Sequence, residues 1–165
     1  MDKFSNRYIV NKNTLAIFYN HDPLYITKIL EPDQTIYCTR TALKVLEDSC
    51  IEGGASLAGR KEVMKRVLRT RTKLPIPVNP KMGIYMFPTK SHLNIECNWI
   101  SFFHVSGYWS STDKKDHLEI QFTNGSKHTI ASSYTSFQKQ MLKTGLAVAY
   151  YCRNDFWPDD GLTLY

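Results

Sequence analysis

Three prolines within six residues, at Pro75, Pro77 and Pro80, exclude a helix from residues 74–80. A proline ring removes a backbone donor and clashes with the preceding helical turn, whereas an edge strand or an extended connector tolerates it. We therefore expect these residues to be extended. Helix-like and strand-like patterns occur on both sides of them, so the sequence favours a fold that mixes helices with strands.

Short apolar segments bounded by turn residues predict most of the strands, at residues 15–19, 24–30, 35–38, 83–87 and 98–105. Residues 98–105 are apolar on both faces, as expected of a central strand. The clearest hairpin joins residues 118–123 to residues 127–131. The turn between them contains Asn124-Gly125, a pair that suits the positive backbone dihedral angles of a type I′ turn.

Helical patterns begin at hydroxyl residues that can cap them: Thr39 or Thr41 for a helix through Ser49, Ser56 for a second helix, and Ser133 or Ser136 for a final one. The expected inner faces are Ala42, Leu43 and Leu46 in the first, Leu57, Met64, Val67 and Leu68 in the second, and Phe137, Met141, Leu142 and either Leu146 or Ala149 in the third. The prediction is an α+β fold, a mostly antiparallel sheet with two or three helices in a single compact domain. This domain spans residues 1–152 and is followed by a tail over residues 153–165.

Positive charge is concentrated in residues 60–73, which hold seven basic residues and one acidic residue. The whole protein has a formal net charge of +6, from 21 Lys and Arg and 15 Asp and Glu, so the remaining 14 basic and 14 acidic residues balance. Concentrated charge of one sign attracts an extended partner of the other sign, most commonly nucleic acid. The candidate contacts are Arg60, Lys61, Lys65, Arg66, Arg69, Arg71 and Lys73.

Two conformations would present these cations on one face. In a helix, Lys65, Arg66 and Arg69 lie opposite the apolar side chains. In a strand that begins at Val63, the residues that share one face are Lys65, Arg69, Arg71 and Lys73. We expect a helix that gives way to an extended chain near Thr70. A solvated basic face is the simpler alternative, but the density of charge and the arginines favour nucleic acid, since arginine suits phosphates and narrow minor grooves.

A glycine-rich stretch precedes the basic residues and resembles an incomplete phosphate-binding loop. In residues 54–61, Arg60 and Lys61 stand where such a loop has lysine and a hydroxyl that holds magnesium, so nucleotide hydrolysis has little support. Glycines still permit close backbone approach to an anion at a helix N-terminus, although they can equally form a simple turn. We expect Gly53, Gly54 and Gly59 to shape a loop that lets the cations approach a phosphate.

Catalytic and metal-binding patterns are absent from the sequence, so we expect neither enzyme activity nor a cofactor or metal. The four cysteines have no Cys-x-x-Cys pair, and a zinc site that combines Cys97 with His92 or His104 lacks finger-type spacing. His104 lies in an apolar segment, where a hydrogen-bonded structural histidine is commoner than a catalytic base.

A helix-turn-helix over residues 39–68 fits poorly, because its turn is long and Gly59 falls where apolar packing is needed.

A series of motifs occurs in a familiar order: Gly53-Gly54-Ala55-Ser56-Leu57-Ala58-Gly59-Arg60-Lys61, Pro75-Ile76-Pro77-Val78-Asn79-Pro80, Phe87-Pro88-Thr89, Cys97-Asn98-Trp99-Ile100-Ser101, His104-Val105, Phe122-Thr123-Asn124-Gly125 and Ser133-Tyr134-Thr135-Ser136-Phe137. This order and spacing resembles the competence transcription factor (ComK) family of Firmicutes. The similarity covers residues 35–140, and the first 30 residues match only loosely.

The resemblance implies a sequence-preferring transcriptional activator of late competence genes, those for DNA uptake and recombination. It implies binding of paired A-rich and T-rich boxes in double-stranded DNA through the minor groove, as a homo-oligomer that bends the DNA. Minor-groove recognition needs no recognition helix, which agrees with the poor helix-turn-helix pattern. Family members can also carry a longer C-terminal tail whose apolar segment binds an adaptor for proteolysis. This chain ends at Tyr165 after Asp155-Phe156-Trp157-Pro158, so an adaptor and protease partner stays open for it.

Two other functions remain open on the sequence. The basic face could bind an acidic protein partner, or residues 54–61 could bind a phosphate ligand. An RNA-binding role is disfavoured, because aromatic residues are not interleaved with the basic ones. Residues 1–7 lack the apolar core of a secretory signal and no run reaches the roughly 18 apolar residues of a membrane span, so we expect a cytoplasmic, nucleoid-associated protein without a membrane partner.

Overall fold

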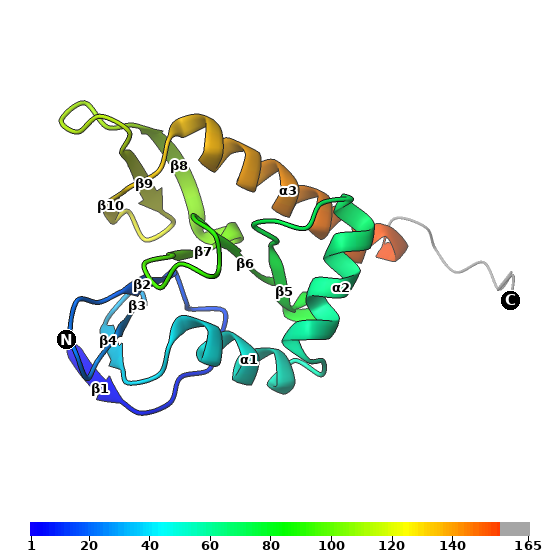
Figure 1. Ribbon diagram of the computed structural model, residues 1–165, viewed down its shortest axis with the longest axis horizontal. Coiled ribbons are helices and arrows are strands. Elements are labelled where there is room, and N and C mark those ends of the chain that lie inside the picture. The colour runs from blue at the N-terminus through cyan, green and yellow to red at the C-terminus, as the bar shows by residue number, and fades with distance from the viewer. Residues whose placement is uncertain (156–165) are drawn as a thin grey trace, which may run out of the picture.

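The computed structural model describes residues 1–155, which fold into two β-sheets and three α-helices (Figure 1). The larger sheet has seven strands in the order β1 (Asp2–Ser5), β4 (Thr35–Cys38), β3 (Thr27–Leu30), β2 (Ala16–Tyr19), β7 (Trp99–Ser101), β6 (Ile84–Pro88) and β5 (Ile76–Asn79). Its neighbouring strands are antiparallel except for β1 and β4. The smaller sheet is antiparallel and contains β10 (Lys127–Ile130), β9 (Leu118–Phe122) and β8 (Val105–Ser110). The α+β prediction is confirmed.

The helices are α1 (Ala42–Glu52), α2 (Leu57–Leu68) and α3 (Tyr134–Cys152), and short 3₁₀ turns follow at Pro80–Met82, Phe102–His104 and Arg153–Asp155. Capping hydroxyls begin each α-helix as expected: the side chains of Thr41, Ser56 and Ser133 accept hydrogen bonds from the backbone three residues on. The helices α1 and α2 pack on β5, and α3 packs on β6 and β8 (Figure 1). Residues 156–165, most of the predicted tail, lie outside the described residues.

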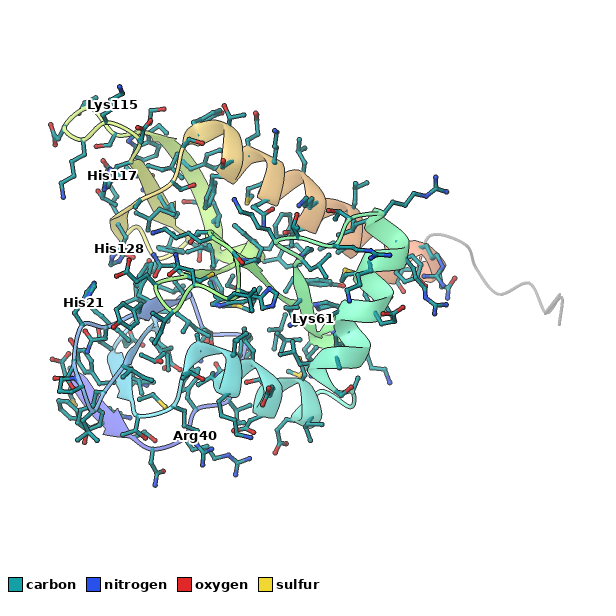
Figure 2. All side chains as sticks on the ribbon, in the orientation of Figure 1. His21, Arg40, Lys61, Lys115, His117 and His128 are labelled. Carbon is teal, nitrogen blue, oxygen red and sulfur yellow. The ribbon has the colours of Figure 1, made fainter. Side chains whose placement is uncertain are left out.

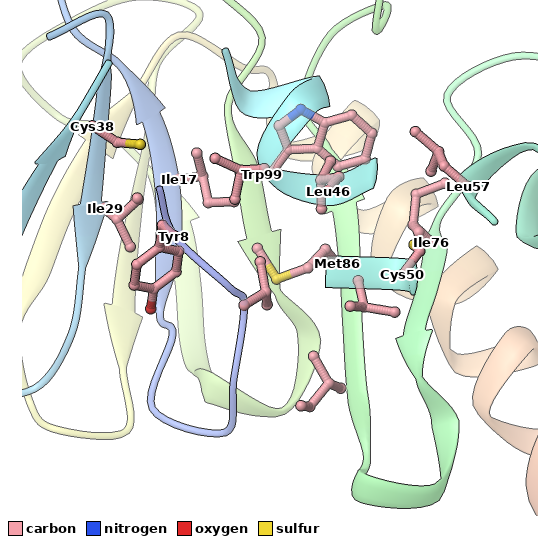
Figure 3. Close-up of a cluster of buried hydrophobic side chains, with 14 of the residues drawn as sticks. Tyr8, Ile17, Ile29, Cys38, Leu46, Cys50, Leu57, Ile76, Met86 and Trp99 are labelled. Atoms are coloured by element: carbon pink, nitrogen blue, oxygen red, sulfur yellow. The ribbon is translucent and has the colours of Figure 1, made fainter. Parts of the chain in front are cut away.

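Apolar side chains cover both faces of the central strands, so the large sheet lies between two cores. On one face, Trp99 and Ile17 pack with Leu46 of α1 (Figure 3). On the other, Ile100 packs with the inner face of the small sheet and with Phe137 of α3. Successive residues of a strand point to opposite faces, which is why an uninterrupted apolar pattern is required at Trp99 and Ile100.

Residues 98–105 do not form one strand, which corrects the sequence prediction. Pairing with the large sheet ends at Ser101, and a 3₁₀ turn over Phe102–His104 carries the chain into β8 of the small sheet. Phe102 faces two apolar clusters at once, one around Phe137 and one around Met64. The hydrophobicity that suggested a continuous strand belongs to a corner where the chain changes sheets.

The hairpin turn and the inner face of α3 also differ from expectation. Only Gly125 has a positive φ in this turn, and its N–H donates to Phe122 O, so the connection is a three-residue loop closed by a glycine bulge instead of a type I′ turn. In α3 the buried residues are Phe137, Gln140, Thr144 and Ala147, with Met141 partly buried, whereas Leu142, Leu146 and Ala149 are exposed. No helix among residues 1–155 has the length and apolarity to cross a membrane.

Candidate nucleic-acid interface

Helix α2 presents part of the basic stretch to solvent. Leu57 and Met64 are buried on its inner side, while Lys65 and Arg66 are exposed, so the expected amphipathic helix is confirmed over its first turns and up to Leu68. The ambiguity between helix and strand is therefore resolved in favour of a helix that ends close to Thr70.

The basic loop that follows α2 is bounded by two strained residues. Arg69 has φ 54° and caps α2 in the left-handed conformation, and Lys73 has φ 49°. A non-glycine residue in this region costs roughly 1–2 kcal/mol, and it persists only where surrounding contacts impose the conformation. Strained residues of this kind concentrate at functional sites, so residues 69–73 are a candidate functional segment.

Helix α3 supplies contacts that hold the Thr72–Lys73 end of this loop. The buried amide of Gln140 donates from Nε2 to Lys73 O and to Pro88 O, at 2.9 Å each. One turn further on, Lys143 Nζ donates to Thr72 O at 3.2 Å. The loop is thus fixed against α3 by side chains about seventy residues away in sequence, and its cations are presented on a preformed backbone.

Within residues 1–155, acidic side chains leave most of this charge without an ion-pair partner. Of the ion pairs within residues 1–155, one involves the basic stretch: Arg66 Nε lies 3.3 Å from Glu62 Oε1, with both side chains largely exposed. An exposed pair of this kind contributes little stability and exchanges readily for another anion. Between α2 and the loop is a hollow of about 570 Å³, lined by Glu62, Lys65, Arg66, Arg69, Thr70 and Arg71.

Arg60 differs from the exposed candidates because its partly buried guanidinium contacts other parts of the protein. Its Nη2 donates to Gly53 O at 3.1 Å, and its guanidinium lies 6.0 Å from the ring centre of Tyr151. These contacts join the start of α2 to the end of α1 and to α3. Its position gives Arg60 a role in packing the three helices.

Lys61 lies on the side of α2 toward the β6–β7 loop (Figure 2). The side chain of His92 in that loop is partly buried, and burial, followed by the positive charges of Lys61 and Lys65, lowers its pKa. Sequence reasoning missed His92 as a neighbour of these cations, because the two segments are brought together only by the fold.

The three glycines have separate roles. A Cβ on Gly53 would lie 2.3 Å from the backbone oxygen of Val78, so glycine is needed there for α1 to approach β5. Gly54 has φ +95°, which other residues rarely adopt, and it turns the chain between the two helices. Gly59 lies in the first turn of α2, where its N–H donates to Ser56 Oγ at 3.0 Å.

Two lysines that were not predicted extend the basic surface. Lys139 and Lys143 lie one turn apart on α3, next to the loop that carries Lys73. A signal for them did exist in the sequence, since two cations four residues apart share a face of the expected final helix. What the sequence lacked was the position of that face beside residues 69–73.

The other candidate sites have structural explanations. Nε2 of His104 donates to Lys12 O at 2.6 Å and its Nδ1 pairs with Thr123 Oγ1 at 2.8 Å, as expected of a hydrogen-bonded structural histidine. Cys97 is buried, its thiol donates to backbone oxygens, and burial raises its pKa. Within the described residues, no three His, Cys, Asp or Glu side chains gather into a metal-binding group.

Comparison with known proteins identifies the family. Residues 5–153 match the family model described as ComK protein. Over 138 residues the chain is 35% identical to the competence transcription factor of Bacillus subtilis (strain 168), covering 83% of this chain and 71% of that protein. No solved structure matches significantly. With a family match over nearly its whole length and a relative at this level of identity, the chain belongs to the ComK family.

Proposed function

We propose that the protein is a DNA-binding transcriptional activator of late competence genes that reads A/T-rich boxes through the minor groove. The relative's description as a competence transcription factor supports the biological role. The observation that carries the DNA-binding role is the preformed loop over residues 69–73, which presents unbalanced arginines beside the exposed cations of α2. Residues 1–152 serve as the DNA-binding domain.

A minor-groove mode follows from the shape of the candidate interface. Major-groove readers insert a helix or a two-stranded ribbon, whereas a narrow minor groove admits an extended segment with arginine side chains. Residues 69–73 form a short non-helical segment between α2 and β5, with a left-handed residue at each end. The exposed Arg69 and Arg71 are the groove contacts in this proposal, and Lys65 and Arg66 contact phosphates.

The first experiment measures affinity for an A/T-box duplex and for a scrambled duplex across a range of salt concentrations. Replacing Arg66, Arg69 and Arg71 together with glutamine should reduce the slope of log affinity against log salt by about 0.9 for each phosphate that the variant no longer binds. The matched control replaces the exposed Lys12, Lys114 and Lys115, which removes the same charge from other surfaces, and should leave the slope unchanged. An unchanged slope in the arginine variant would refute the assignment.

The second experiment separates the two grooves. Replacing A·T by I·C pairs preserves the minor-groove pattern of acceptors but presents the major-groove pattern of G·C. We expect the I·C duplex to bind as tightly as the A/T box, and a G·C duplex, whose guanine amino group projects into the minor groove, to bind more weakly. Loss of binding on I·C substitution would instead indicate major-groove reading.

Paired boxes imply more than one protomer on each operator. We propose a homo-oligomer on DNA, in agreement with the family resemblance, and its stoichiometry is measured by sedimentation with one-box and two-box duplexes. Equal affinity for box and scrambled duplexes would oppose sequence preference and would favour a general polyanion or acidic-protein partner.

A further inference from the structure

Three lysines from distant parts of the sequence form a cationic cluster beside the arginine loop. Lys73 closes the loop, and Lys139 and Lys143 lie one turn apart on α3. Two like charges at this spacing destabilise a helix by a few tenths of a kcal/mol. The repulsion between Lys139 and Lys143 therefore slightly destabilises α3.

Hydrogen bonding fixes the cluster in place. The ammonium group of Lys143 is held 3.2 Å from Thr72 O, immediately next to Lys73, and the backbone of Lys73 is held in turn by Gln140. Partial burial, and then the charges of Lys73 and Lys139, lower the pKa of Lys143. The positive charges of Lys73 and Lys139 therefore lie close enough to act on the ammonium group of Lys143.

Carboxylates do not compensate this charge in the described part of the chain. The ion pairs within residues 1–155 use Arg7, Lys44 and Arg66 as their cations, and none of the three lysines takes part. A compact ammonium group is a common point-charge ligand of phosphate, and a bound phosphodiester would relieve the mutual repulsion of the cluster.

We infer that Lys73, Lys139 and Lys143 bind a backbone phosphate of the DNA strand that lies on the α3 side of the arginine loop. This inference rests on the proposed minor-groove function. A segment that enters a minor groove has a phosphodiester strand on each side, so it needs cations on both flanks. Lys65 and Arg66 of α2 line the hollow that they share with Arg69 and Arg71, and Lys143 of α3 contacts the loop at Thr72.

The test replaces Lys139 and Lys143 with glutamine in the full chain and measures affinity for the A/T-box and scrambled duplexes across salt. A phosphate contact carries no sequence information, so affinity should fall by the same factor on both duplexes. The slope of log affinity against log salt should decrease by about 0.9, the value for one lost phosphate contact. A slope equal to that of the wild type would overturn the inference.

Control variants separate charge from loop geometry. Lys143→Arg keeps both the charge and the donor to Thr72 O and should retain the wild-type slope. Lys139→Gln alone leaves that hydrogen bond intact and should still weaken binding of both duplexes, whereas a purely structural role of the Lys143 hydrogen bond would leave the affinity unchanged. The pair Lys114→Gln/Lys115→Gln removes two charges near the far end of the small sheet (Figure 2) and should have no effect.

The outcomes distinguish this inference from the proposed function. If the arginine variant loses salt dependence and the lysine variant does not, the α3 contact is wrong and DNA binding by the loop stands. If the wild-type protein binds neither duplex, both proposals fail. A methylphosphonate scan of each strand provides a further check: one neutral linkage should weaken the wild type but leave the lysine variant unaffected, and absence of any such linkage would contradict a defined contact.

Discussion

Replacing Gly53 with alanine should destabilise the protein, although an alanine at this position meets no backbone strain. Gly53 has φ −80° and caps the C-terminal end of α1. Where the conformation is compatible, Gly→Ala stabilises by about 0.4–1 kcal/mol, because the unfolded chain has less freedom to lose. The new methyl group, however, would lie 2.3 Å from Val78 O, a backbone atom in the buried strand β5.

The magnitude follows from the balance of these two effects. Overpacking typically costs about 1–3 kcal/mol, and the upper end applies here because the obstructing atom belongs to a sheet backbone and cannot rotate away. Subtracting the gain from the unfolded state leaves a loss of about 2 kcal/mol. For a domain of this size, that corresponds to a decrease in Tm of roughly 4–8 °C.

Thermal and urea denaturation of Gly53→Ala and Gly59→Ala measure the effect. Gly59 is the matched control, since its Cβ would meet only the Ser56 side chain at 3.1 Å and alanine is favoured within a helix by about 1 kcal/mol. We expect the Gly59 variant to equal or exceed wild-type stability. A Gly53 variant as stable as the wild type would refute the close-packing explanation. A folded Gly53 variant with an altered salt slope would instead support the predicted loop-shaping role in DNA binding.

Two further predictions concern stability. Gln140→Leu should lower the free energy of unfolding by roughly 2–4 kcal/mol, because the carbonyls of Lys73 and Pro88 lose their buried donor; an unchanged urea midpoint would contradict this. Burial is the main cause that lowers the pKa of His92 and His128 below 6.5, and the charges of neighbouring lysines lower it further. The folded protein therefore favours the neutral form of both imidazoles. The stability that depends on the neutral histidines is present above pH 6.5 and is lost as the pH falls through the lowered pKa values. The urea midpoint should therefore decrease on acidification, and it should depend less on pH in a His92→Gln/His128→Gln variant.

The sequence predicted elements well where the signal was local. The prolines predicted an extended chain where the edge strand β5 lies, and the hydroxyl caps included the residues that begin all three helices. The apolar side of α2 identified its buried residues Leu57 and Met64. Each of these signals depends on backbone chemistry or on periodicity within a few residues, so no knowledge of tertiary neighbours is required.

Predictions failed where a residue's partner lies far away in the sequence. In α3, hydrophobicity selected Leu142 and Leu146 for the inner face, whereas Gln140 and Thr144 are buried. Gln140 is buried because two distant carbonyls accept its amide hydrogens, and Thr144 because its hydroxyl donates within the helix to Gln140 O at 2.7 Å. A buried polar residue is stable only with hydrogen-bond partners, and the distant carbonyls that Gln140 needs are not part of a local pattern.

The amount and location of positive charge along the chain are fixed by the sequence, which by itself indicates a polyanionic partner. Only the tertiary structure turns that charge into a surface. It directs Arg60 inward, holds residues 69–73 in a strained loop, and places Lys139 and Lys143 beside that loop from about seventy residues away. Electrostatic potential depends on distances through space, and those distances are set by how α3 packs against β6 and α2.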